Sequence, residues 1–273
     1  IEVKIMLKDV NKYSPIGVFD SGIGGLTVLN KLIDMFPNED FVYVGDTINL
    51  PYGTKLKETL KMYVSDVSNY LEKIPVKSIV IACNTATANS HHLKDYIDIP
   101  IIGVIEPTAK AALKISENIL VLATNVTIES GEYKKVIDEY KKDKNSKQYY
   151  IKASEFVEAI EANDINTSHS FKLVREKLEQ VKNEKIDVII LGCTHFGLFA
   201  NEISAVFPNT TLLECATPTG EELGRSLQEL DLARNDNNQG KTIINVTKMQ
   251  DNFYDKTKWF KHPYQGCYEI KIK

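Results

Sequence analysis

The sequence has few cysteines, no long apolar run and no excess of basic residues. Its 273 residues carry a formal net charge of −4, so the composition offers no basic surface for nucleic acid or for an anionic membrane. No stretch is long and apolar enough to span a bilayer, and no leader of the signal type is recognisable. We therefore expect a small-molecule substrate, with no nucleic-acid and no membrane partner.

Only four cysteines occur, which is too few for a disulfide framework in a chain of this length. This usage indicates a reducing, cytoplasmic setting, in which any cysteine that matters acts as a thiol. We assign no function to residues 1–14.

Short apolar runs rich in β-branched residues alternate with longer segments of helical period. This pattern is typical of parallel strands joined by crossover helices, and it predicts an α/β fold. With 43% hydrophobic residues, the chain can build one large domain or two modest ones, and we expect two compact α/β halves. The expected strands cover residues 16–19, 41–44, 78–82, 101–104, 119–123, 188–191, 211–213 and 242–246, and the expected helices lie within 26–36, 56–70 and 171–181.

Polar side chains follow several of these strands at the point where each strand ends. In open parallel sheets, ligands bind beyond the carboxyl ends of the strands, so these side chains are candidates to line one cleft. The candidates are Asp20, Ser21, Asp46, Cys83, Asn84, Thr85, Glu106, Thr124, Cys193, Thr194 and His195.

A weak internal repeat supports two equivalent halves. Residues 79–85 resemble residues 189–194, and residues 16–19 resemble residues 119–122. Each half then offers one cysteine at the same strand end, just before an expected helix whose backbone amides favour a thiolate.

Two cysteines in matching positions suit acid/base chemistry at a carbon centre. Inverting an amino acid without a cofactor needs a base and an acid on opposite faces, and Cys83 and Cys193 fit that requirement. His195 can tune the neighbouring thiol or donate a proton, and Asp20 can do the same for the other thiol. A free cysteine is more often a small buried hydrophobic residue, and we keep that interpretation for Cys215 and Cys267.

The glycine-rich turn at residues 22–25 offers a rival interpretation. Backbone amides before a helix suit a carboxylate or a phosphate, and Asp46 at the next strand end loosely imitates the dinucleotide-binding fingerprint. However, Thr27 occupies the third glycine position of that fingerprint, and Asp20 and Ser21 lie where a pyrophosphate would approach.

Metal and acyl-transfer chemistry are less well supported. Cys193 and His195 lie on one segment, and no companion pair has zinc-type spacing. Ser21 lacks the nucleophile-elbow pattern. Cys83 as an acylating nucleophile with His195 as its base remains an alternative, but it leaves Cys193 unexplained.

Five short motifs occur in order along nearly the whole chain. They are Phe19-Asp20-Ser21-Gly22 with Gly24-Gly25-Leu26-Thr27, then Pro51-Tyr52-Gly53, Ala82-Cys83-Asn84-Thr85-Ala86, Gly103-Val104-Ile105-Glu106-Pro107 and Leu191-Gly192-Cys193-Thr194-His195. Together they resemble the glutamate racemases of the aspartate/glutamate racemase superfamily. Residues 241–273 match that family poorly.

The resemblance implies a two-thiol mechanism in which Cys83 deprotonates D-glutamate and Cys193 deprotonates L-glutamate, with the opposite thiol returning the proton. It implies neither pyridoxal phosphate nor a metal. Asp20 assists Cys83, His195 assists Cys193, and Glu161 falls at a further acidic position of the family. The residues assigned to substrate binding are Asp20, Ser21, Pro51, Tyr52, Gly53, Asn84, Thr85, Thr194 and His195.

Three segments depart from the family pattern. Alanine and arginine usually precede the Pro-Tyr-Gly motif, tyrosine and proline usually follow the Cys-Thr-His motif, and a cysteine and prolines usually precede the acidic position. The residues found instead are Ile48 and Asn49, Phe196 and Gly197, and Ala153, Ser154 and Glu158.

The resemblance also implies an architecture of two similar parallel-sheet α/β domains with a pseudo-twofold relation and the active site between them. The first domain comprises residues 1–106 and 214–273, and the second comprises residues 107–213. A homodimer is expected, and the product D-glutamate is expected to serve peptidoglycan synthesis. Two alternatives are a racemase of aspartate or hydantoins and a non-catalytic protein that binds glutamate.

Overall fold

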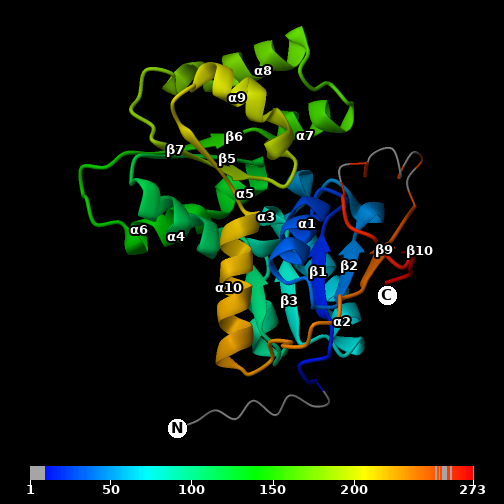
Figure 1. Ribbon diagram of the computed structural model, residues 1–273. Coiled ribbons are helices and arrows are strands. Elements are labelled where there is room, and N and C mark those ends of the chain that lie inside the picture. The colour runs from blue at the N-terminus through cyan, green and yellow to red at the C-terminus, as the bar shows by residue number, and fades with distance from the viewer. Residues whose placement is uncertain (1–9, 250, 252, 254–256, 259, 273) are drawn as a thin grey trace. The chain divides into compact units, whose positions relative to one another are not determined.

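Two compact units make up the chain in the computed structural model (Figure 1), which describes residues 10–249, 251, 253, 257–258 and 260–272. One unit consists of Ile1–Val104 and Ala216–Lys273, and the other consists of Ile105–Cys215. Each unit contains one β-sheet in which all strand pairs are parallel. The predicted α/β class with two parallel-sheet domains is confirmed.

The first unit contains a six-stranded sheet with the order β10-β9-β2-β1-β3-β4. Its strands are β1 (Ile16–Asp20), β2 (Phe41–Gly45), β3 (Ser78–Ile81), β4 (Ile101–Gly103), β9 (Thr242–Val246) and β10 (Cys267–Glu269). Its helices are α1 (Leu26–Met35), α2 (Lys57–Lys73), α3 (Asn84–Thr87) and α10 (Ala216–Glu229).

Helices cover both faces of this sheet. Ile16 and Val18 of β1 belong to a core cluster that includes Leu29 of α1 and Leu223 of α10. Gly17 points to the opposite face, where a Cβ atom would lie 3.2 Å from the side chain of Leu71 in α2. Alternate residues of one strand therefore pack against different helix layers, so the strand is buried throughout.

The second unit contains a four-stranded sheet with the order β6-β5-β7-β8. Its strands are β5 (Ile119–Ala123), β6 (Gln148–Lys152), β7 (Val188–Gly192) and β8 (Thr211–Glu214). Its helices are α4 (Ile105–Ile115), α5 (Asn125–Ser130), α6 (Glu132–Tyr140), α7 (Ser154–Glu161), α8 (Ser168–Leu178) and α9 (Ala200–Val206).

The two sheets repeat the same strand connectivity. In the first unit β1 pairs with β2 on one side and β3 on the other, and in the second unit β5 pairs with β6 and β7 in the same way. The strands that resemble each other in sequence, β1 with β5 and β3 with β7, therefore hold equivalent places in the two sheets. Cys83 and Cys193 follow equivalent strands.

All eight predicted strands are present, each within one residue of its expected bounds. Strands β6 and β10 were not predicted. Both lie at the edge of a sheet, and only Ile151 of the five residues in β6 is buried. Across the described residues, the helices are too short or too polar to serve as membrane spans.

An ion pair is buried near the amino end of the first sheet. Lys77 is fully buried, and its ammonium group contacts the carboxylate of Glu39, which is 4% exposed. The same ammonium group donates hydrogen bonds to the backbone carbonyls of Lys12, at 2.7 Å, and Leu232, at 2.9 Å. Burial lowers the pKa of Lys77, and the interaction with Glu39 offsets part of that effect.

Removing one partner of this pair should be strongly destabilising. We expect Lys77→Met to lower the free energy of unfolding by about 3 kcal/mol, because the Glu39 charge is left buried without its cation. Exposed Lys73→Met should change it by less than about 0.5 kcal/mol. Urea unfolding would measure both. The double variant Lys77→Met/Glu39→Gln should recover part of the loss. Equal stabilities of Lys77→Met and Lys73→Met would contradict this account.

Candidate active site

The carboxyl end of β1 carries a buried acid that is held by a glycine turn. Asp20 is 1% exposed, and its Oδ1 accepts a hydrogen bond of 2.9 Å from the amide of Gly22. The turn packs tightly on this side chain, since a Cβ atom on Gly25 would lie 2.4 Å from the Cβ of Asp20. The Gly22 amide that the dinucleotide interpretation would offer to a phosphate is therefore bonded to a carboxylate of the protein.

Cys83 follows β3 and is the N-cap residue of α3. It is 8% exposed, and its Sγ accepts a hydrogen bond of 3.5 Å from the amide of Ala86. The hydroxyl oxygen of Ser21 lies 3.7 Å from the same sulfur. An amide donor aimed at the sulfur stabilises a thiolate, so Cys83 has the surroundings of a reactive thiol.

Tyr43 of β2 contacts the glycine turn, and the sequence analysis did not identify it. Its hydroxyl donates a hydrogen bond of 2.6 Å to the carbonyl of Gly22. Complete burial, with further contributions from the charges of Asp20 and Cys83, raises the pKa of Tyr43 well above its ordinary value. Tyr43 therefore stays neutral and acts as a hydrogen-bond donor that fixes the glycine turn.

A loop that follows β2 carries the Pro-Tyr-Gly motif. Tyr52 is 1% exposed, and its hydroxyl donates a hydrogen bond of 2.6 Å to Oδ2 of Asp46. The peptide bond between Leu50 and Pro51 is cis. Burial and the negative Asp46 raise the pKa of Tyr52. The phenol is therefore anchored inside the protein, whereas Pro51 is exposed and Gly53 is partly exposed.

The second unit brings together three ionisable side chains. Nδ1 of His195 lies 3.8 Å from Sγ of Cys193, and its Nε2 lies 2.8 Å from Oε1 of Glu161. Cys193 follows β7 and is partly exposed, whereas His195 is 8% exposed. The imidazole therefore links the thiol to the carboxylate.

The electrostatics of this trio favour a charged imidazole. Burial lowers the pKa of His195, but the hydrogen bonds with Cys193 and Glu161 outweigh it and raise the pKa to about 10. Both ring nitrogens of an imidazolium are donors, which suits one contact to sulfur and one to a carboxylate. The positive charge of His195 therefore lies beside the sulfur of Cys193.

Aromatic packing aligns the elements that carry the trio. Phe156 of α7 packs with its ring centroid 5.4 Å from that of Phe196 and 5.4 Å from that of Phe199. Glu161 is the last residue of α7, Phe196 directly follows His195, and Phe199 ends the same short 3-10 helix. The hydrogen bond between Glu161 and His195 is thus supported by a buried apolar contact.

Some of the other predicted residues lie beside Cys83 or Cys193, and others do not. Asn84 and Thr85 are buried in the first turn after Cys83, and Thr194 lies between Cys193 and His195. Two strand-end candidates have other roles: the exposed Glu106 forms an ion pair with Lys110, and Thr124 caps α5.

Cys215 and Cys267 both have the surroundings of structural residues. Cys215 is 5% exposed, and its thiol donates to the carbonyl of Leu191 at 3.4 Å. Burial raises the pKa of Cys267 to about 11, which disfavours its thiolate.

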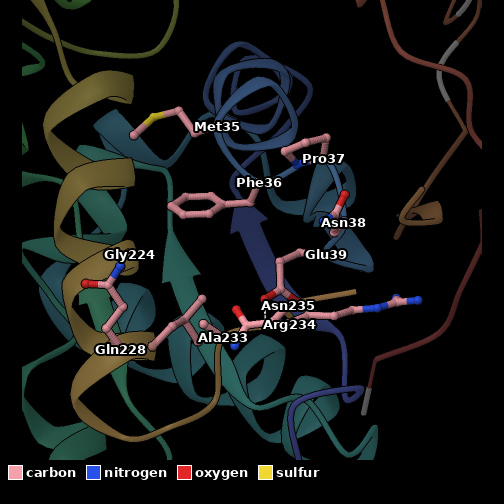
Figure 2. Close-up of a pocket in the computed structure, with 11 residues that line it drawn as sticks. Met35, Phe36, Pro37, Asn38, Glu39, Gly224, Gln228, Ala233, Arg234 and Asn235 are labelled. Atoms are coloured by element: carbon pink, nitrogen blue, oxygen red, sulfur yellow. Dashed lines mark hydrogen bonds between the residues drawn. The ribbon is translucent and has the colours of Figure 1, made fainter. Parts of the chain in front are cut away.

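A cavity of about 220 Å³ opens elsewhere in the first unit, beside the segment that leads into β2 (Figure 2). It therefore lies at the amino end of the strands, away from the candidate catalytic side chains. Its charged groups already have partners, because Glu39 pairs with Lys77 and the guanidinium of Arg234 pairs with Asp40 and Asp236. We assign no site to it. Its lining is Met35, Phe36, Pro37, Asn38, Glu39, Gly224, Leu227, Gln228, Ala233, Arg234 and Asn235.

Comparison with known proteins gives a consistent family. The sequence model of the Asp/Glu/Hydantoin racemase family matches residues 26–217. The glutamate racemase of Clostridium perfringens strain ATCC 13124 is 36% identical over 243 residues, which span 87% of this chain and 92% of the relative.

Solved structures agree with the sequence match. A glutamate racemase isoform from Bacillus anthracis superposes with a TM-score of 0.89 at 32% identity, covering 96% of this chain and 98% of that protein. The glutamate racemase of Francisella tularensis, solved in complex with D-glutamate, superposes with a TM-score of 0.88 at 29% identity over 96% and 98% of the two chains.

Replacing Glu161 should shift the titration of His195. We expect Glu161→Gln to lower the pKa of His195 from its value of about 10, because the carboxylate charge is lost. Since that pKa lies above the ordinary 6.5, the protonated form contributes stability that is complete below pH 6.5 and is lost as the pH rises through 10. In the variant, the loss should occur at lower pH.

An NMR titration of the imidazole would measure the shift. Glu158→Gln provides a matched control, because Glu158 is an exposed acid on the same helix. If the two variants titrate alike, Glu161 does not set the charge of His195.

Proposed function

The chain belongs to the aspartate/glutamate/hydantoin racemase family, and on that premise we propose that it interconverts L-glutamate and D-glutamate with Cys83 and Cys193 as the acid/base thiols. The substrate is inferred from the glutamate racemases that match most of the chain. The observation that carries the two-thiol assignment is the position of one cysteine at the end of each of two equivalent strands.

Racemisation by this pair transfers one proton in and one proton out. From D-glutamate, the Cys83 thiolate removes the α-proton, and the Cys193 thiol donates its proton to the opposite face of the carbanion. The reverse direction exchanges these roles. After one turnover of D-glutamate, Cys83 is the thiol and Cys193 is the thiolate, so their protonation states are interchanged. The proposed chemistry therefore balances in protons and needs no added oxidant, metal or cofactor.

On the Cys193 side, we assign His195 and Glu161 a supporting role. A protonated imidazole can direct its Nδ1–H toward the sulfur and stabilise the thiolate, while the Glu161 carboxylate accepts from Nε2–H. The contact of 2.8 Å between Glu161 and Nε2 of His195 supports a fixed orientation of the imidazole ring. A fixed ring keeps the Cys193 thiolate aligned with the carbon atom that it must deprotonate.

On the Cys83 side, we assign the same task to the amide of Ala86 and to Asp20. The 3.5 Å contact from the amide supports a stabilised thiolate. Asp20 is placed by the glycine turn, and we propose that it assists proton transfer at Cys83.

Substrate binding requires donors for two carboxylates and acceptors for one ammonium group. For the carboxylates, hydroxyl and amide groups near the thiols are suitable donors, and for the ammonium group the buried Asp20 is a suitable acceptor. The residues that we propose for binding are Asp20, Ser21, Pro51, Tyr52, Gly53, Asn84, Thr85, Thr194 and His195.

We further propose that the enzyme works in the cytoplasm and supplies D-glutamate for peptidoglycan synthesis. All four cysteines are free thiols, which a reducing compartment maintains and which the mechanism requires. The cell-wall role follows from the family resemblance.

We expect a homodimer in solution, because members of the family commonly form one. Sedimentation equilibrium should give twice the chain mass of 30.8 kDa at micromolar concentration. A particle of the single-chain mass across that concentration range would refute this assembly.

The function is tested by incubating L-glutamate and D-glutamate separately with the protein in deuterated buffer. We expect optical rotation to decay from either enantiomer while deuterium enters the α-position. Cys83→Ser and Cys193→Ser should each slow racemisation by at least about a hundredfold, because a serine hydroxyl is a far poorer base near neutral pH.

Cys267→Ser is the matched control, and it should retain full activity because that cysteine has no assigned role. Full activity in either site variant would overturn the two-thiol assignment. Binding of glutamate without exchange would indicate a non-catalytic protein, and turnover of aspartate or hydantoins instead would reassign the substrate.

A further inference from the structure

Asp46 is a buried carboxylate whose hydrogen-bonding capacity is taken up by the protein. It is 2% exposed, and it lies directly after β2 at the start of the Pro-Tyr-Gly loop, residues 46–53. Oδ2 accepts from the Tyr52 hydroxyl at 2.6 Å, Oδ1 accepts from the Thr247 hydroxyl at 2.9 Å, and the Asn49 amide reaches both oxygens at 2.9 and 3.1 Å. A carboxylate bonded in this way is suited to holding a loop and not to proton transfer.

The loop is also tied to the C-terminal part of the chain by reciprocal hydrogen bonds. Thr247 follows β9 and accepts at its hydroxyl oxygen a bond of 2.9 Å from the amide of Ile48. In return, the hydroxyl of Thr47 donates to the carbonyl of Lys248 at 2.6 Å and accepts from its amide at 2.9 Å. Two threonines, 200 positions apart in sequence, thus each bond to the backbone of the opposite segment.

The sheet extends up to this junction. β2 and β9 pair in register from Phe41 with Thr242 to Gly45 with Val246, and the Thr247 amide continues the ladder to the carbonyl of Gly45 at 3.0 Å. The junction is therefore attached to a rigid strand pair, which gives the loop a fixed base. Asp46 is linked to the reactive end of β1 as well, because its amide donates to the carbonyl of Asp20 at 3.0 Å.

We propose that Asp46 and Thr247 are positioning residues that set the geometry of the Pro-Tyr-Gly loop for glutamate binding. This inference rests on the proposed function, since it takes Tyr52 and Gly53 to contact the substrate. Thr247 acts through Asp46, and Asp46 acts through Tyr52. Neither residue exchanges a proton with the substrate.

The hydroxyl of Thr247 is the group to remove. In Thr247→Val, Asp46 loses a donor and the Ile48 amide loses its acceptor, while the side-chain volume is nearly unchanged. We expect KM for both glutamate enantiomers to rise about tenfold, the effect of losing one hydrogen bond to a charged group, while kcat changes less than about twofold. Amide hydrogen exchange of residues 46–54 should become faster.

Two further variants separate positioning from general stability. Thr247→Ser keeps the hydroxyl and should restore the wild-type KM. Thr242→Val changes a buried threonine at the other end of the same strand and should leave KM and the exchange of residues 46–54 unchanged. An equal rise of KM in the valine and serine variants at 247, or an equal rise in both valine variants, would overturn the proposal.

Failure of this inference can be told apart from failure of the proposed function. If the wild-type chain does not racemise glutamate, the proposed function falls, and the exchange measurement still decides whether Thr247 holds the loop. Faster exchange in Thr247→Val alone supports that role. Exchange equal to the wild type overturns it.

Discussion

Parallel strands that are covered on both faces can present polar side chains only where the strands end. This constraint explains where the candidate catalytic groups of both units lie. Asp20, Asp46 and Cys83 stand at or just beyond the ends of β1, β2 and β3, and Cys193 stands just beyond β7. Backbone ladders fix how far each strand projects, so the spacing of these groups within a unit is set by the sheet and not by mobile loops. The loops then need only small hydrogen-bonded networks to orient the side chains.

The two sheets have equivalent connectivity, yet the two thiols have different surroundings. The sulfur of Cys83 accepts a hydrogen bond from the backbone amide of Ala86 at the start of a helix, and this amide carries only a partial positive charge. Cys193 faces His195, whose raised pKa makes it a full positive charge that Glu161 balances. Proton removal from opposite faces of one carbon does not demand identical bases. The proposed mechanism needs two thiols that can each be held as a thiolate, and the residues beside Cys83 and Cys193 offer different electrostatic groups for that role.

Local sequence patterns predicted the elements that depend on local apolar runs, but not the contacts between distant residues. Buried strands such as β5 are continuous apolar runs and were predicted, whereas β6 has one buried side chain, Ile151, and gives no such signal. The strand-end rule identified Asp46 and His195 without a structure. The same rule could not identify the residues that these two side chains contact. Glu161 was reached only through the family resemblance, because its contact with His195 spans 34 positions and depends on how α7 packs. Thr247 was missed, since its contact with Asp46 spans 201 positions and falls in the segment that resembles the family least.

Two buried acidic side chains hold loops in place, one in each unit. Asp46 holds the Pro-Tyr-Gly loop in the first unit. In the second unit, Oε1 of the fully buried Glu202 in α9 accepts from the amide of Asn166 at 2.6 Å and from the hydroxyl of Ser170 at 2.8 Å, and so ties α9 to the loop before α8, while its Oε2 has no hydrogen-bond partner among the described residues. Burying polar groups is expensive, and such side chains seldom add net stability compared with apolar packing. Their hydrogen bonds instead restrict the loops that they contact. In the proposed reaction, which needs two bases aligned on one carbon, a fixed loop offsets that loss of stability.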